Sequence, residues 1–167
     1  MADAATRPVV VVIGVGNSLR HDDAAGLEAV RRLRGRGCDA EIALCEHEGE
    51  TLGLLERWQN ARAVVLVDAI HSGATPGTIH RLDASAEPIG ARLPGSSSTH
   101  ALGVGEAIEL ARELRRLPAR VVLYGVEGRN FEAGSGLSPE VAATIDALAD
   151  AVHGEARSLA AATAAWP

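Results

Sequence analysis

The chain has 167 residues and a formal net charge of -6, and Ala, Val, Leu and Ile supply nearly all of its apolar content. This length suits one domain with a substantial core and is too short for two of ordinary size. The negative charge, together with only one Phe, one Tyr and two Trp, argues against a nucleic-acid-binding protein, which needs basic surface and aromatic stacking platforms.

We expect a single domain at residues 8–154, with a flexible leader at residues 1–7 and a helix extension or tail at residues 155–167. The apolar run that begins at Val9 has only five residues before Gly14, which is too short for the core of a signal peptide or for a membrane span. The sequence therefore predicts a cytoplasmic protein without a membrane partner.

The first predicted strand covers residues 9–13, where β-branched side chains without polar alternation are typical of a strand buried on both faces of a parallel sheet. Gly14-Val15-Gly16-Asn17 follows, and two glycines around one residue mark a sharp turn or a close backbone approach. A dinucleotide fingerprint would need a third glycine where the chain has Leu19. No Gly-Lys-Ser/Thr follows the turn, which excludes a phosphate-binding P-loop.

Two acids, Asp22 and Asp23, stand between this turn and an amphipathic helix with Leu27, Val30 and Leu33 on its apolar stripe. Asp is a preferred N-cap residue, and one carboxylate is enough to cap a helix. Two interpretations stay open: both acids serve the helix start, or one caps while the other points into a cleft. Ligands of open α/β sheets bind at the carboxyl ends of the strands, which is where this junction lies.

Residues 40–45 alternate as a second strand, and Glu46-His47-Glu48-Gly49-Glu50 comes directly after it. Such a cluster looks like a metal site, although acids before a helix are more often first-turn residues favoured by the helix dipole. A short helix is expected around Leu52, Leu55 and Trp58.

The two cysteines, Cys38 and Cys45, match no zinc or redox spacing. We expect both to be buried free thiols. A Cys45 nucleophile paired with His47 is the weaker alternative.

A second buried strand covers residues 63–68 and ends in Asp68. A lone acid at a strand end often only binds loop amides, but parallel strands would bring Asp68 and Asp23 to the same edge of the sheet. Residues 78–83 read as an edge strand, and His71 and His80 are expected to be exposed.

The segment from Pro88 to Ser98 has loop chemistry and is a candidate mobile segment that delivers Thr99-His100 to the start of the next helix. The last buried strand covers residues 120–126, and Glu127 follows it. Ser138-Pro139 has the pattern of an N-cap and a first helical proline, so one final helix is expected from there.

This alternation of strands and helices predicts a three-layer α/β/α domain with a mostly parallel sheet of about five strands. Asp23, Asp68 and His100 would then meet at one edge of the sheet. Two carboxylates and one imidazole form a mixed oxygen and nitrogen set that suits a borderline cation such as nickel or zinc.

The sequence resembles the hydrogenase maturation proteases from about Val9 to Val152, and that family has a twisted sheet flanked by helices. Ala24-Ala25-Gly26 departs from the glycine that many members have directly after the acid pair, and Glu46-His47-Glu48-Gly49 replaces a more glycine-rich acidic loop. The matching positions are Gly14-Val15-Gly16-Asn17, Leu19, Asp22-Asp23, Gly26, Val67-Asp68-Ala69, Ser98-Thr99-His100 and Gly103.

Members of this family are endopeptidases, aspartic-type in family terms, that remove a C-terminal extension from the large subunit of [NiFe] hydrogenases. The resemblance implies that Asp23, Asp68 and His100 are the catalytic and nickel-contacting residues. It also implies that the nickel is supplied by the substrate rather than held at rest. The supporting residues are expected to be Asn17, Asp22 and Glu127.

The resemblance leaves open whether a nickel-polarised carbonyl, an activated water or an Asp general base cuts the peptide bond. An alternative function is a non-catalytic nucleotide-binding or metal-binding α/β module. The sequence names neither the hydrogenase, nor the cleavage site, nor the oligomeric state.

Overall fold

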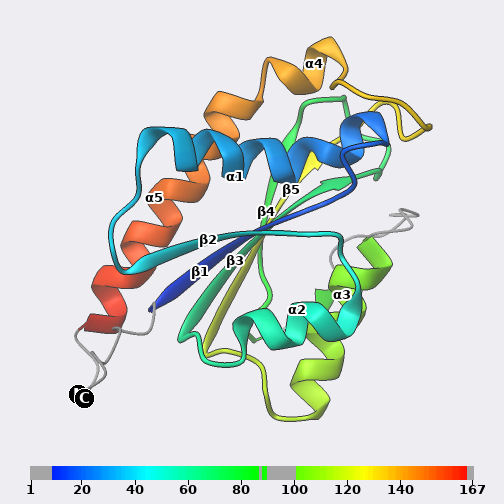
Figure 1. Ribbon diagram of the computed structural model, residues 1–167. Helices are drawn as coiled ribbons and strands as arrows, with labels where there is room; N and C mark the ends of the chain where they lie inside the picture. The colour runs from blue at the N-terminus through cyan, green and yellow to red at the C-terminus, as the bar shows by residue number, and fades with distance from the viewer. Residues whose placement is uncertain (1–8, 87, 90–100, 165–167) are drawn as a thin grey trace.

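The computed structural model describes residues 9–86, 88–89 and 101–164 (Figure 1). Its elements in chain order are β1 (Val10–Val15), the 3-10 helix η1 (His21–Ala24), α1 (Ala25–Arg36), β2 (Ile42–His47), α2 (Thr51–Trp58), β3 (Ala63–Ile70), β4 (Ile79–Asp83), α3 (Ala101–Glu113), β5 (Arg120–Glu127), α4 (Pro139–Ala142) and α5 (Ile145–Ala164). No described helix is long and apolar enough to cross a bilayer.

The five strands form one sheet in the order β2-β1-β3-β5-β4. The pairs β1–β2, β1–β3 and β3–β5 are parallel, and only β4 runs antiparallel, beside β5. Helices α1 and α5 cover one face of the sheet, and α2 and α3 cover the other (Figure 1). The predicted three-layer fold with a mostly parallel sheet is therefore confirmed, and so is the edge position of the strand at residues 79–83.

Two apolar clusters, one on each face of the sheet, form the core. Val10 and Val12 of β1 belong to the cluster under α1 and α5, whereas Val11 and Ile13 belong to the cluster under α2 and α3. This division follows from the strand period of two, which sends successive side chains to opposite faces. An uninterrupted run of valines is therefore what a central strand of a three-layer domain needs.

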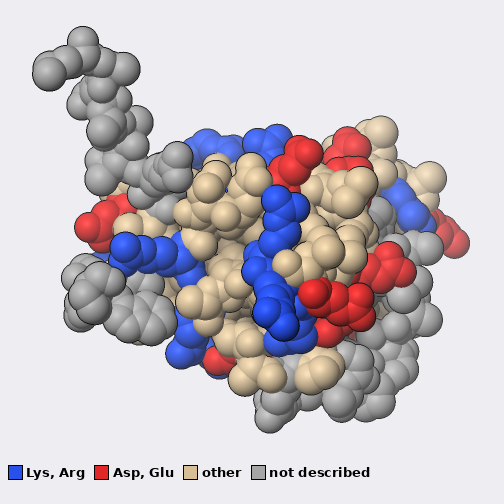
Figure 2. All heavy atoms as spheres, turned by 90° about the horizontal axis from the view of Figure 1, so that it is seen from below, with Lys and Arg blue, Asp and Glu red and all other residues tan. Residues whose placement is uncertain are grey.

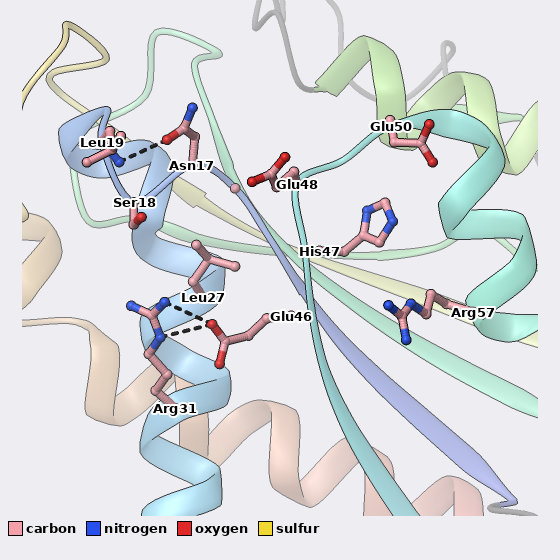
Figure 3. A pocket seen from close by; sticks show the side chains of 11 residues that line it. Asn17, Ser18, Leu19, Leu27, Arg31, Glu46, His47, Glu48, Glu50 and Arg57 are labelled. Atoms are coloured by element: carbon pink, nitrogen blue, oxygen red, sulfur yellow. Dashed lines mark hydrogen bonds and ion pairs between the residues drawn. The ribbon is translucent and has the colours of Figure 1, made fainter.

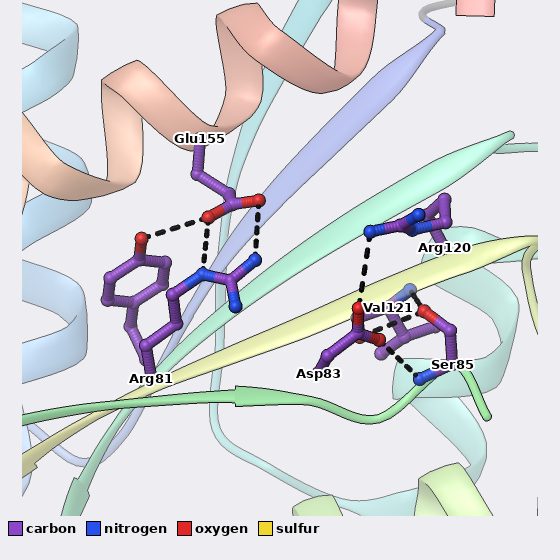
Figure 4. Close-up of polar contacts among 7 residues, drawn as sticks. Arg81, Asp83, Ser85, Arg120, Val121 and Glu155 are labelled. Atoms are coloured by element: carbon purple, nitrogen blue, oxygen red, sulfur yellow. Dashed lines mark hydrogen bonds and ion pairs between the residues drawn. The ribbon is translucent and has the colours of Figure 1, made fainter. Parts of the chain in front are cut away.

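The antiparallel strand β4 is fastened to its neighbours by polar contacts (Figure 4). Arg81 on β4 donates two hydrogen bonds to Glu155 on α5, at 2.7 and 3.0 Å, and the Tyr124 hydroxyl donates to the same carboxylate at 3.0 Å. The Arg81 contact holds the pKa of Glu155 below its usual range, although burial acts in the opposite direction. These bonds join β4, β5 and α5 at the edge of the sheet.

Charged side chains of both signs lie beside one another on the surface, as the view from below shows (Figure 2). Between α1 and α5, Arg32 lies 2.9 Å from Asp146, and Arg36 lies 2.5 Å from Asp150. Exposed pairs of this kind contribute roughly 0–1 kcal/mol each. The packing of α1 on α5 therefore depends mainly on the apolar core.

The final helical segment is divided, which corrects the prediction of one continuous helix. α4 ends at Ala142, and α5 begins at Ile145 after a turn in which the Thr144 hydroxyl donates to the Glu140 carbonyl at 3.0 Å. A Thr side chain that bonds the carbonyl four residues earlier tends to bend a helix. Ser138 lies at the N-cap position and Pro139 is the first helical residue, as predicted, but the Ser138 hydroxyl donates to Asp22 and does not cap α4. α5 continues to Ala164.

Helix α1 begins in backbone contact with the sheet. A Cβ added to Gly26 would collide with the carbonyl oxygens of Val67 on β3 and Val15 on β1. Gly16, with φ +149°, would collide with the Asp23 carbonyl if it had a side chain. These two glycines allow the 17–26 segment to lie directly on the carboxyl ends of β1 and β3, which brings Asp23 to the end of β3.

Replacing Gly26 by Ala should lower the free energy of unfolding by about 1–3 kcal/mol, the usual result of forcing extra atoms into a packed region. Gly35→Ala in the same helix is the matched control, because nothing lies within 4 Å of its added Cβ. That control should stabilise the protein by up to about 1 kcal/mol through helix propensity. Denaturant unfolding of both variants tests this. Equal changes in the free energy of unfolding at the two positions would contradict the close contact between Gly26 and the sheet.

Candidate active site at the carboxyl edge of the sheet

Two buried carboxylates, those of Asp23 and Asp68, lie where η1 meets the end of β3. Each residue is only 1% exposed. The Asn17 N–H donates to Asp23 Oδ2 at 3.0 Å, and the Ala69 N–H donates to Asp68 Oδ1 at 2.9 Å. The β1–η1 loop and β3 therefore each hold one acid at the same edge of the sheet.

The two carboxylates interact electrostatically. Burial first, and then the negative charge of Asp23, raise the pKa of Asp68 well above its ordinary value of 3.8, against the smaller effect of the Ala69 N–H. Two carboxylates that share a buried site cannot both ionise easily. Such a pair favours a shared proton or a bound cation.

The neighbouring acid, Asp22, has a different environment although it is also fully buried. Its oxygens accept hydrogen bonds from the N–H groups of Arg129 at 2.8 Å, Asn130 at 2.9 Å and Ser138 at 2.6 Å. The Ser138 hydroxyl donates to it as well, at 2.7 Å. Burial alone would raise the pKa of Asp22, but the Ser138 hydroxyl and these backbone N–H groups together lower it. Asp22 therefore fastens the loop 129–138 to η1.

The interpretation that one acid of the pair caps the first helix is wrong. The residues that precede η1 and α1 are Arg20 and Ala24, and neither makes a side-chain cap. The carboxylate of Asp22 is taken up by N–H groups more than a hundred positions away, and Asp23 accepts from Asn17. The partners of Asp22 are distant in the sequence, so the local sequence around the acid pair does not indicate them.

The third residue of the predicted set, His100, lies outside the described residues, and so do residues 90–98 of the predicted mobile segment at residues 88–98. The described part of the chain has no group of three His, Cys, Asp or Glu side chains arranged to hold a metal ion. Asp23 and Asp68 are two members of the predicted three, and the complete set stays a prediction.

The supporting residues Asn17 and Glu127 have defined contacts. The Asn17 side chain accepts from the Leu19 N–H at 2.9 Å, which closes the loop that holds Asp23. Glu127 accepts from the N–H and hydroxyl of Ser72 at 2.8 and 2.7 Å, and so fixes the loop after β3. Its carboxylate also lies 3.8 Å from His80.

The exposure expected for the two histidines after β3 is confirmed for His71 and wrong for His80. The His71 side chain is 55% exposed, whereas that of His80 is 30% exposed. The Nε2 atom of His80 is buried and has no hydrogen-bond partner among the described residues. The antiparallel pairing places His80 opposite Gly125, and this brings its ring beside Glu127.

The Glu46-His47-Glu48 cluster does not converge on one point. Glu46 pairs with Arg31 at 2.9 Å and Arg34 at 2.6 Å, and these arginines lower its pKa although burial opposes them. His47 Nδ1 accepts from the Gly49 N–H at 2.9 Å, and Glu50 caps α2 by accepting from the Gly53 N–H. Among the described residues, the cluster forms surface pairs and a helix cap rather than a metal site.

Both cysteines are free thiols, as predicted, and both are half-buried. The Cys45 thiol donates weakly to the Glu46 carbonyl at 3.5 Å. Burial, followed by the charge of Asp39, raises the pKa of Cys38, which makes its thiolate less accessible. Neither environment is that of an activated nucleophile.

An open pocket of about 520 Å³ lies between the β1–η1 loop and the β2–α2 loop (Figure 3). Asn17 and Leu19 line one side, and His47, Glu48 and Arg57 line the other. Asn17 joins the pocket to Asp23, because its N–H holds that carboxylate. Sequence reasoning missed this pocket, since its walls come from two segments, residues 16–31 and 46–57, that are separated in the sequence.

The family model for hydrogenase maturation proteases matches residues 30–155. The chain belongs to the hydrogenase maturation protease family. It is 32% identical over 149 residues to the hydrogenase expression/formation protein HupD of Rhodobacter capsulatus, covering 86% of this chain and 70% of that protein. It is 30% identical to the hydrogenase 2 maturation protease of Escherichia coli strain K12, over 82% of this chain and 84% of that protease.

Solved structures of this family share the fold. The hydrogenase maturating endopeptidase HybD of Escherichia coli superposes with a TM-score of 0.78 at 28% identity, covering 89% of this chain and 92% of that one. The [NiFe] hydrogenase maturation protease HybD of Thermococcus kodakarensis gives a TM-score of 0.72 at 27% identity, covering 88% and 98%. This hydrogenase maturation protease is therefore a peptidase, and the alternative of a non-catalytic module is set aside.

Asp22→Asn should lower the free energy of unfolding by about 2–3 kcal/mol at neutral pH, because hydrogen bonds to a charged acceptor contribute about 1.5–3 kcal/mol. The folded-state pKa of Asp22 is lowered, so its contribution is complete above the ordinary value of 3.8 and is lost as pH falls below it. Denaturant unfolding at about pH 7 and about pH 3 measures the difference between variant and wild type. If the difference in free energy of unfolding between variant and wild type were as large at about pH 3 as at about pH 7, the ionised Asp22 carboxylate would not stabilise the fold.

Asp68→Asn should stabilise the protein at neutral pH. Its melting temperature should rise by roughly 2–4 °C for each kcal/mol by which the free energy of unfolding increases. The pKa of Asp68 is raised in the folded state, so ionisation of Asp68 destabilises the fold as pH rises above 3.8. An amide at this position cannot ionise, and the destabilisation is absent from the variant. The control is Asp83→Asn on β4, where hydrogen bonds from Ser85 outweigh burial and lower the pKa. Calorimetry should show the opposite sign there, and a less stable Asp68→Asn protein would contradict the repulsion.

Proposed function

We propose that this protease removes the C-terminal extension of a [NiFe] hydrogenase large-subunit precursor after nickel insertion, and that it recognises the nickel already bound in that precursor. Asp23, Asp68 and His100 would contact this nickel and carry out the cleavage. The proposal also places the reaction in the cytoplasm, where an unprocessed precursor would be met.

The buried pair formed by Asp23 and Asp68 is the observation that carries this proposal. Placing two carboxylates side by side at 1% exposure costs free energy unless a proton or a cation compensates their charge. A nickel ion presented by the substrate would supply that compensation at the moment of binding. His100, the residue before α3 in the sequence, would add the nitrogen ligand that a borderline cation favours.

The surroundings of the pair suit a substrate that brings its own metal. Asn17 and Ala69 each donate one backbone N–H to the acids, and these two bonds orient the carboxylates without neutralising them. Asp22 and Glu127 are saturated with loop N–H groups and do not compete for a cation. The two acids at the centre are therefore the place where a nickel ion could replace a shared proton.

Three cleavage routes fit these residues: a carbonyl polarised by nickel, a water activated by nickel, or a water activated by one of the carboxylates. In each route Asp68 matters, because burial and the charge of Asp23 raise its pKa above the ordinary value and so favour its holding a proton.

Incubation with nickel-loaded large-subunit precursor tests the proposal. The wild-type protease should shorten the precursor, as seen by mass spectrometry, and nickel-free precursor should be cut much more slowly. Asp23→Asn, Asp68→Asn and His100→Ala should each lower kcat/KM by about 100-fold or more. The double variant Cys38→Ser, Cys45→Ser is the control and should keep its activity.

Two results would overturn the proposal. Equal cleavage of nickel-loaded and nickel-free precursor would remove nickel recognition. Full activity of the His100→Ala protein would remove His100 from the site, and loss of activity in the folded double cysteine variant would favour a thiol mechanism.

A further inference from the structure

Strand β2 has one unpaired edge in the described part of the chain. The strand order places β2 at the border of the sheet, where its only described neighbour is β1. Figure 1 shows this border strand between α1 and α2. A border strand presents a row of N–H and C=O groups that another extended chain can bind.

The register identifies which groups point outward. The Val10 N–H donates to the Glu41 carbonyl at 3.2 Å, and the Gly16 N–H donates to the His47 carbonyl at 3.0 Å. In a parallel strand, alternate residues direct both backbone groups to the same neighbour. Ala43 and Cys45 therefore face β1, whereas Leu44 and Glu46 direct their N–H and C=O groups to the open edge.

The usual protections of an edge strand are weak here. Natural edges are often blocked by proline, by a bulge or by a charged side chain. Residues 42–47 contain no proline and pair with β1 without a bulge. The only acid among them, Glu46, is drawn toward α1 by Arg31 and Arg34, as Figure 3 shows for Arg31.

The open edge leads to the acid pair. β2 ends at His47, and Glu46 and His47 line the 520 Å³ pocket together with Asn17. The N–H of Asn17 holds the carboxylate of Asp23. An extended chain that followed β2 would therefore run into this pocket beside the proposed cleavage site.

We propose that the C-terminal segment of the precursor binds as an added strand along the open edge of β2, with Leu44 and Glu46 supplying the backbone hydrogen bonds. This inference rests on the proposed function. Backbone pairing of this kind holds a peptide in the extended form and takes its affinity from main-chain groups, so it tolerates variation in the segment that is removed.

Amide hydrogen exchange at single-residue resolution tests this inference. It is measured on the full-length wild-type protease during turnover of excess nickel-loaded precursor. The N–H groups of Leu44 and Glu46 should exchange roughly tenfold more slowly than in the free protein. Ala43 and Cys45 are internal controls, because their N–H groups are already bonded to β1 and should not change.

A pair of variants gives a second readout. Leu44→Pro removes the outward N–H, and proline is tolerated on an edge strand. Leu44→Ala shortens the side chain and keeps the N–H. With the fold verified by circular dichroism, Leu44→Pro should raise KM several-fold over Leu44→Ala and leave kcat nearly unchanged.

Several results would overturn the inference. If the precursor is cut while the N–H groups of Leu44 and Glu46 exchange as fast as in the free protein, strand addition is wrong and the proposed function still holds. Slow exchange of both residues in the free protein would show an edge that is already covered. Protection that grows with protease concentration alone would assign the edge to a second copy of the chain. Precursor that is neither bound nor cut would overturn both proposals.

Discussion

The candidate site depends on the contact between the first turn of α1 and the ends of β1 and β3. At Gly26 the helix backbone touches the carbonyl oxygens of Val15 and Val67, so no side chain fits between helix and sheet. Only this approach allows a residue three positions earlier, Asp23, to share its surroundings with Asp68 at the end of β3. The acid pair is thus a consequence of backbone packing, and a slightly wider spacing would separate the two charges.

Two acids at this edge of the sheet, Asp22 and Asp68, have opposite electrostatic environments. Asp22 is surrounded by donors and is more acidic than usual, whereas burial beside Asp23 makes Asp68 less acidic. The hydrogen bonds to Asp22 stabilise the fold, whereas the charges of Asp23 and Asp68 repel each other unless a cation or a proton lies between them. Functional sites commonly store unfavourable interactions that the surrounding structure makes tolerable, and the bonds of Asp22 supply such support here.

The sequence predicts the fold well because the signal is strong and local. Valine runs at β1 and β3 indicate parallel strands, and the glycine pair before Asp22 and Asp23 indicates a tight junction with the helix. It also predicts that Asp23 and Asp68 reach the same edge, since parallel strands share one carboxyl end. The division of the last helix was missed, because it depends on a hydroxyl bond from Thr144 to the preceding turn.

Long-range partners explain the other errors. Nothing near Asp22 indicates that its ligands are the N–H groups of residues 129–138, and nothing near Glu46 indicates that α1 supplies two arginines to it. The bonds of Asp22 have a further consequence for synthesis on the ribosome. The turn with both acids emerges early, but its anchor is complete only after Ser138 has left the exit tunnel. A nascent chain thus contains both acids well before Asp22 can be held in place, and the candidate site is complete only late in translation.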